Sequence, residues 1–188
     1  MDYNRNFKYM HAAASVLVAA VCFFASCSEN VEKVDAIHDR SKTPSLRASD
    51  VMTVVSDSGI TRYRVNAKEW LVYDRAAEPY WDFPKGLHLE KFDTELKVDA
   101  EIKSKYAIYY TKKKLWDLRD SVHAMNLKGE NFECKRLFWD ENEQRVYSDD
   151  TITIKQTDKT IVGKGFESNQ SLTRYTIRKV TGMFPVSE

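Results

Sequence analysis

Apolar and charged side chains alternate along the stretch Leu96-Lys97-Val98-Asp99-Ala100-Glu101-Ile102. A period of two is typical of a β-strand that turns one face to an apolar core and the other to water. The same period returns in residues 151–155 and 174–178, whereas no segment has a convincing amphipathic helical period. The pattern therefore predicts an all-β protein.

Turn-forming residues separate the predicted strands at regular intervals. Ser56-Asp57-Ser58-Gly59 lies between the β-prone residues 52–55 and 60–65, and Lys128-Gly129-Glu130 marks a later turn. Short alternating strands joined by such turns are typical of an antiparallel sandwich or barrel. We expect one folded domain over residues 51–188.

The N-terminus has the order of a secretion signal. Basic Arg5 and Lys8 precede the apolar residues 12–24, and two small residues then precede Cys27, which resembles the lipobox of bacterial lipoproteins. The apolar run of about 13 residues is shorter than the roughly 20 that a membrane span requires, so an uncleaved anchor is the weaker alternative. We expect a signal peptide over residues 1–26, lipidation of Cys27 and a flexible tether over residues 27–50. The lipid would hold the chain on a membrane, although the signal does not distinguish the inner from the outer one.

Charge and cysteine content narrow the function. The chain has 29 basic and 28 acidic residues, and this balance argues against nucleic-acid binding, which requires a basic surface. Loss of Cys22 with the signal and lipidation of Cys27 would leave Cys134 alone, so no intramolecular disulfide is expected. Cys134 lies on the apolar side of a predicted strand and is interpreted as a buried thiol.

The sequence carries no recognisable catalytic constellation. His88 and His123 lie in separate segments without neighbouring cysteine or histidine, so no metal site is predicted. Neither a phosphate-binding glycine loop nor a nucleophile elbow is present, which indicates no cofactor and no enzyme. Asp140, Glu141 and Glu143 are interpreted as the solvated tip of a hairpin rather than as the carboxylate pair of a glycosidase.

Several segments between Tyr80 and Phe184 follow one another in a characteristic order and spacing: residues 83–90, 105–110, 115–122, 137–140, 146–149 and 161–168. This order resembles the LptC family, the membrane-anchored periplasmic component of lipopolysaccharide export, and most of all its lipoprotein branch in Bacteroides-type bacteria. Two departures are visible. Asp120-Ser121-Val122 stands where the family has a Gly-Asn-Val turn, and a lipobox stands where better-known members have a transmembrane helix.

The resemblance implies an open, V-shaped antiparallel β-jellyroll of the OstA/LptA-like kind, with an apolar trough between its two sheets. Such a protein would receive lipopolysaccharide from the inner-membrane ABC transporter LptB/LptF/LptG and pass it to an LptA-like jellyroll. It would act in outer membrane biogenesis, on the periplasmic side of the cell inner membrane. Exposing acyl chains to water costs about 0.8 kcal/mol per CH₂, so a continuous apolar lining is the feature that such transport needs.

Strand parity assigns the residues of the implied trough, and a register slip of one residue would invert the assignment. The inward set is Val98, Ala100, Ile102, Trp116, Leu118, Val122, Ala124, Phe132, Cys134, Ile152, Ile154, Tyr175 and Ile177. From alternation alone, these residues also fit an ordinary sandwich core. The implied partner edges are Met52 and Val54 at the transporter end, and Tyr175, Ile177 and Val180 at the end that would meet the next jellyroll.

The alternative function is that of a carbohydrate-binding β-sandwich lipoprotein. Its binding surface would consist of exposed aromatic side chains, with Trp81 and Trp139 as candidates. Aromatic residues on strands more often belong to the core, so the exposure of these two tryptophans separates the alternatives.

Overall fold

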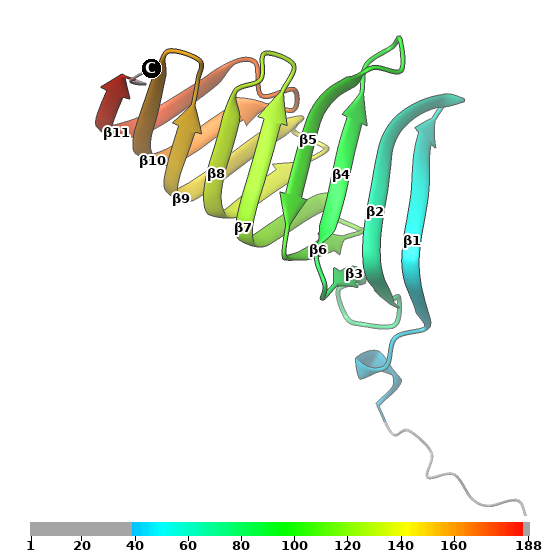
Figure 1. Cartoon of the computed structure of the whole chain (residues 1–188). Helices are drawn as coiled ribbons and strands as arrows, with labels where there is room; N and C mark the ends of the chain where they lie inside the picture. The colour runs from blue at the N-terminus through cyan, green and yellow to red at the C-terminus, as the bar shows by residue number, and fades with distance from the viewer. Residues whose placement is uncertain (1–38, 186–188) are drawn as a thin grey trace, which may run out of the picture. The chain divides into compact units, whose positions relative to one another are not determined.

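The structure, a computed structural model, describes residues 39–185. The predicted signal peptide and Cys27 lie outside these residues. A short 3-10 helix, Arg40–Lys42, precedes eleven strands (Figure 1). The strands are β1 (Leu46–Asp57), β2 (Ile60–Tyr73), β3 (Tyr80–Phe83), β4 (Leu87–Phe92), β5 (Val98–Ser104), β6 (Tyr106–Tyr110), β7 (Leu115–Asn126), β8 (Asn131–Asp140), β9 (Arg145–Lys155), β10 (Lys159–Asn169) and β11 (Tyr175–Pro185).

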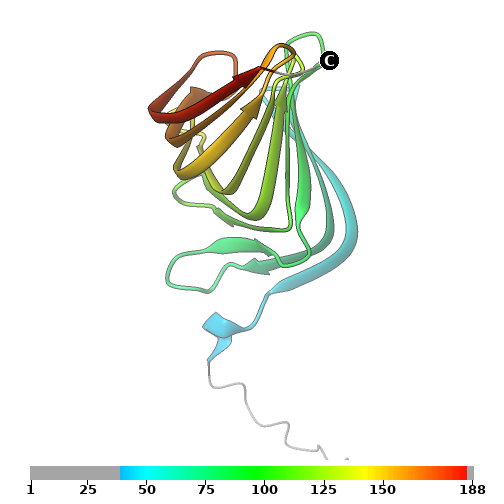
Figure 2. The same cartoon turned by 60° about the vertical axis from the view of Figure 1, so that its left-hand side comes forward.

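All strands belong to one antiparallel sheet, in the order β11-β10-β9-β8-β7-β5-β4-β2, with β1 on the outer side of β2. The long strands bend, so the sheet folds back and its two layers face each other (Figure 2). The all-β antiparallel jellyroll that the sequence predicts is confirmed. Tight turns account for most of this topology, because they return the chain beside the strand it has just left; the connections from β3 to β4 and from β5 to β6 instead join strands that do not pair with each other.

Six strands close into a hydrogen-bonded ring. β2 pairs with β4 through residues 63–67 and with β3 through residues 71–73. β7 pairs in the same divided way, with β6 through residues 115–119 and with β5 through residues 123–126. Pairing of β3 with β6 and of β4 with β5 completes the circuit. Strands β8 to β11 are instead added to the ring one after another.

The line along which the sheet folds is marked by left-handed backbone angles. In β7, Asp120 and Ser121 both have φ of 58°, and the β7–β8 ladder shifts register at this point. In β10, Gly165 has φ of 74°, again beside a register shift. Asp adopts the left-handed region more easily than most non-glycine residues, so Asp120 makes the bend without a glycine.

The first strand begins at Leu46, five residues before the predicted start of the domain at Val51 and inside the predicted tether. Ser45 N donates to Val72 O at 2.8 Å, and residues 46–49 continue the ladder along β2. Most side chains of residues 46–49 are exposed, and four residues of alternation are too few to mark a strand. Backbone hydrogen bonds to β2 determine where this strand begins, and the hydrophobic pattern of the sequence does not predict such bonds.

Candidate functional site

The predicted trough residues lie between the two layers of the sheet. Nine of the thirteen are buried, namely Ala100, Ile102, Trp116, Leu118, Val122, Ala124, Phe132, Ile152 and Ile154. Cys134, Tyr175 and Ile177 are partly buried and pack against them. Val98 is half-buried at the beginning of β5, next to a register shift after Lys91, and lies outside the buried cluster.

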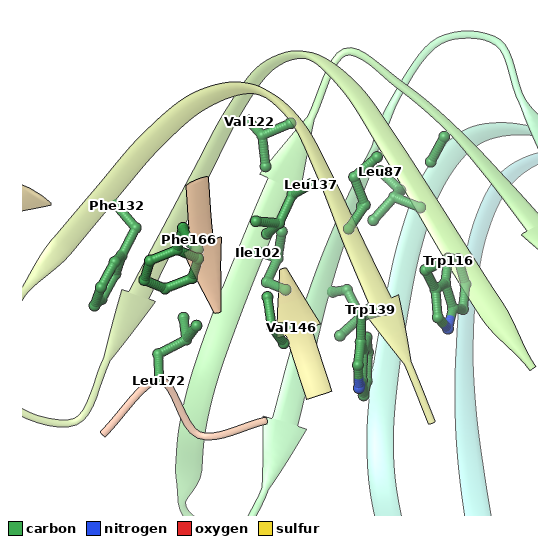
Figure 3. Packing of buried hydrophobic residues seen from close by; sticks show 14 of the residues in the cluster. Leu87, Ile102, Trp116, Val122, Phe132, Leu137, Trp139, Val146, Phe166 and Leu172 are labelled. Atoms are coloured by element: carbon green, nitrogen blue, oxygen red, sulfur yellow. The ribbon is translucent and has the colours of Figure 1, made fainter. Parts of the chain in front are cut away.

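The same interior contains residues that the sequence reasoning did not assign to it. They include Leu87, Leu89, Leu137, Trp139, Val146, Phe166 and Leu172 (Figure 3). For most of them the signal was present, because Leu87 alternates with Leu89 and Leu137 with Trp139 along their strands. Leu172 had no such signal, since it lies in the turn between β10 and β11.

One half of the interior is a connected set of aromatic rings. This aromatic cluster consists of Tyr63, Trp70, Trp81, Phe83, Tyr109, Trp116 and Trp139. Ring centroids lie 4.8 Å apart between Trp70 and Trp81 and 4.5 Å apart between Tyr109 and Trp116. Trp139 is only 2% exposed and Trp81 is partly buried within the cluster. The exposed tryptophans expected of the carbohydrate-binding alternative are therefore not found at these positions.

Glu141 reaches into the aromatic cluster, so its interpretation as a solvated turn residue is wrong. Its carboxylate accepts hydrogen bonds from Trp116 Nε1 at 2.9 Å and from Tyr109 OH at 3.3 Å. Burial raises the pKa of the Glu141 carboxyl above its ordinary value, although both hydrogen bonds act in the opposite direction. Glu141 N donates to Lys114 O, so the backbone pairing of β8 with the β7 side continues one residue beyond Asp140. Glu141 therefore points to the same side of the sheet as Trp139, two residues earlier.

The other half of the interior is mainly aliphatic and belongs to the later strands. This C-terminal cluster consists of Phe132, Ile152, Ile154, Ile161, Phe166 and Leu172, with Tyr175 packed beside them. Its rings are fewer, and Phe132 contacts Phe166 and Tyr175 at centroid distances of 5.5 and 5.3 Å.

The interior is closed in this structure. The cavity between the layers, which Leu89, Ala100, Ile102 and Trp139 help to line, has a volume of about 10 Å³. That volume is close to the minimum for a single water molecule. The trough residues therefore pack against one another as a core, and an acyl chain could enter only if a side chain or a layer moved.

A groove with a volume of about 680 Å³ lies along the open side of the folded sheet. The β1–β2 hairpin and the end of β4 form one wall, and the turns after β6, β8 and β10 form the other. Arg62, Lys114 and Arg174 line it, and none of them has an ion-pair partner among residues 39–185. Asp57 and Glu141 are the acidic residues of the same groove, so its charge is positive on balance.

Both outer strands of the sheet have one unpaired edge within residues 39–185. β1 pairs only with β2, and β11 pairs only with β10. Of the predicted edge residues, Met52, Val54 and Val180 are exposed, with Met52 at 70%. Tyr175 and Ile177 instead turn their side chains toward the interior, and Tyr175 OH accepts a hydrogen bond from Gln156 Nε2 at 2.8 Å.

Cys134 is a free cysteine on β8. Burial raises the pKa of its thiol to about 12, so the group is protonated at neutral pH. Its Sγ donates to Arg136 O at 3.3 Å. A protonated, partly buried thiol is a poor nucleophile, and the position suits packing rather than chemistry.

No helix among residues 39–185 has the length and apolar character needed to cross a membrane. In the same part of the chain, no group of three or more acidic, histidine or cysteine side chains is placed to hold a metal ion. Residues 12–183 match the family model described as lipopolysaccharide-assembly, LptC-related. No curated protein matches the chain.

Proposed function

The chain belongs to the LptC-related family of lipopolysaccharide assembly, and we propose that it forms one segment of the bridge that carries lipopolysaccharide across the periplasm. Members of this family are membrane-associated periplasmic components of lipopolysaccharide transport and not enzymes. The chain therefore has a role in that transport and associates with its machinery. The path of the lipid, the partners and the anchor are the parts that we propose.

One observation supports the bridge most strongly. The inward faces of both layers are apolar along the sheet, from the aromatic cluster in the ring to the C-terminal cluster. Acyl chains that move between membranes need such a lining, because each CH₂ left in water costs about 0.8 kcal/mol. In the proposed function, the acyl chains of lipopolysaccharide lie between the layers while its sugars remain in water.

The groove on the open side supports a place for the headgroup. Arg62, Lys114 and Arg174 are available for anionic groups, and guanidinium and ammonium groups form strong hydrogen bonds with phosphate. Tyr63 lines the groove and belongs to the aromatic cluster, so the charged surface is continuous with the apolar interior. An amphiphile with an anionic head and apolar tails matches this combination.

The two free edges suggest how the segment joins its neighbours. Unpaired strand edges favour the addition of a further strand, and exposed apolar side chains beside them would be covered by a partner. We assign the β1 edge to the transporter LptB/LptF/LptG and the β11 edge to an LptA-like jellyroll. Met52→Glu should then weaken capture of the transporter alone, and Val180→Glu capture of the jellyroll alone, because a charge is buried in each interface. Equal loss of both partners in either variant would contradict this assignment.

The anchor belongs to the same proposal. Lipidation of Cys27 would hold the domain at the periplasmic face of the inner membrane, where the transporter delivers its lipid. Cys27→Ala should abolish lipid attachment, measured by mass spectrometry of the protein from cell membranes. Retention of the lipid in this variant would overturn the proposed anchor.

The decisive experiment is photocrosslinking in cells. A light-activated amino acid replaces Trp116, Leu118 or Ile154 inside the fold, and Phe138 serves as the matched control, since it lies on the same sheet but faces outward against Tyr147. We expect adducts with lipopolysaccharide at the interior positions, dependent on ATP and on the transporter, and at least tenfold fewer at Phe138. Absence of adducts at all interior positions would make the interior an ordinary core.

A further inference from the structure

Leu172 is a turn residue whose side chain is completely buried. It lies between β10 and β11, yet it is 0% exposed and belongs to the interior cluster. Figure 3 shows it on its loop beside Phe166, pointing into the core. Its backbone has φ of 55°, a left-handed angle that an apolar side chain rarely adopts. Turns normally run over the surface, so the packing of the interior holds this residue in a strained position.

The turn crosses the open side of the folded sheet and is fastened to the opposite layer. Asn126 Nδ2, at the end of β7, donates to Leu172 O at 2.9 Å. Ser171 Oγ accepts from Lys91 Nζ at 3.2 Å and donates to the carboxylate of Asp99. We call residues 170–173 the lid and these contacts the latch.

The lid contacts the opposite layer through side chains and one backbone carbonyl. The conformation of the lid itself is held by hydrogen bonds within the turn. Leu172 N donates to Asn169 O, and the Asn169 side chain accepts from Thr173 N at 3.0 Å. The β10–β11 ladder ends at the pair Ser168–Tyr175 and residues 170–173 belong to no strand, so no sheet ladder fixes the lid across the opening. The lid can therefore leave the opposite layer without breaking a sheet ladder.

We propose that the lid is a displaceable side wall of the trough, and that Leu172 occupies in the empty protein the place that an acyl chain takes in the loaded protein. The inference rests on the proposed function and adds where the lipid enters. The cavity beside Leu89, Ile102 and Trp139 has a volume of only about 10 Å³, so a side chain must leave before an acyl chain can bind there. A leucine side chain and a stretch of alkyl chain have the same chemistry, so exchanging them keeps the interior dry and packed.

The surroundings of the lid fit the same ligand. Ser171 and Arg174 line the groove that also holds Arg62 and Lys114. When the lid moves outward, the opening lies directly beside this basic surface. An acyl chain could then enter under the lid while its anionic headgroup stays in the groove.

The test is to lock the lid. Asp99→Cys combined with Ser171→Cys is joined by a short bifunctional thiol reagent in the full-length protein, and capture of lipopolysaccharide is measured with the light-activated amino acid at Ile154. The matched control joins Glu133→Cys to Lys155→Cys, a surface pair on neighbouring strands whose native side chains lie 2.7 Å apart. All variants also carry Cys134→Ser, because the partly buried Cys134 is the free cysteine among residues 39–185 and adjoins position 133.

We expect the locked lid to lower the yield of lipopolysaccharide adduct at least tenfold, while the control pair and the untreated double variant keep it. An unchanged yield with the lid locked would overturn the inference and leave the proposed function intact. No adduct in the unlocked protein would refute the proposed function itself, and the lid with it.

A second variant tests the lid without a reagent. Ser171→Ala removes the latch contacts to Lys91 and Asp99 but leaves the interior unchanged. We expect the lid amides to exchange hydrogen several-fold faster and the adduct at Ile154 to form several-fold faster. Faster exchange with an unchanged rate of adduct formation would count against a lid that controls access.

Discussion

The aromatic cluster and the C-terminal cluster fill the same interior but are built differently. Six of the seven aromatic residues lie on strands of the closed ring, and Trp139 of β8 covers them. The C-terminal cluster lies on strands that are attached one after another, and it includes Leu172 from a turn. From this difference we expect the closed ring to be the more rigid part of the interior and the later strands to be the part that rearranges more easily.

The largest effect is expected in the aromatic cluster. Trp139→Ala should lower the free energy of unfolding by about 3–5 kcal/mol, because loss of the large buried indole leaves a cavity. The six hydrogen-bonded strands beside it cannot move inward to fill that cavity. Chemical denaturation measures this loss. Trp139→Phe is the control and should lose much less, since Trp139 Nε1 has no hydrogen-bond partner among residues 39–185. A loss below 1 kcal/mol in the alanine variant would show that the ring is not the rigid part.

Leu172→Ala is expected to be milder. It should lower the free energy of unfolding by about 2–3 kcal/mol, since a turn can settle into part of the cavity that it leaves. Leu118→Ala on β7 makes the same substitution at an equally buried site of the ring. Added lipopolysaccharide should restore more stability to the Leu172 variant than to the Leu118 variant. Equal restoration would remove the distinction between the two clusters.

A smaller change is expected from the latch. Asn126→Ala removes the hydrogen bond to Leu172 O, and it also removes the acceptor for two amides of the β7–β8 turn. Asn126→Asp keeps that acceptor and removes the donor, which also serves Glu130 Oε2 at 2.6 Å, so the new carboxylate lies against that of Glu130. We expect a loss of about 1–2 kcal/mol in the Asp variant, with faster hydrogen exchange in the lid and in the β7–β8 turn that contains Glu130. Faster exchange throughout β10 and β11 would show instead that the lid does not move by itself.

The smallest effect concerns Glu141. Its folded-state pKa is raised, so the folded protein binds the proton more tightly than the unfolded chain, and the stability linked to it falls as pH rises above the ordinary value of 4.5. Glu141→Gln removes this dependence. Thermal denaturation across pH 4–8 should show the variant gaining on the wild type as pH rises, by less than about 1 kcal/mol near neutrality. A difference that is constant with pH would contradict the buried carboxyl.

The sequence predicted what local periodicity reports and missed what distant contacts decide. Alternation placed Ala100, Ile102 and Ile154 between the layers, since a strand repeats its faces every two residues. Leu172 was missed because its burial depends on Asn126, which lies 46 positions away in the sequence. Glu141 was missed because it lies among acidic residues in an apparent turn, which suggested solvent, although its parity with Trp139 pointed inward. Extending the two-residue alternation of β8 beyond Trp139 would have placed Glu141 on the inward face. No rule based on neighbouring residues would have found Leu172.

The closed ring of six strands has a mechanical consequence. A ring of strands bears load as a unit, because opening it requires whole ladders to shear at the same moment. Strands that are added one after another at the edge of a sheet can detach singly, because each is held by only one further ladder. A pull on the C-terminus, where the next jellyroll is proposed to attach, would therefore peel β11, β10, β9 and β8 in succession before the ring felt the force. The C-terminal strands would yield gradually while the six strands of the ring kept their arrangement.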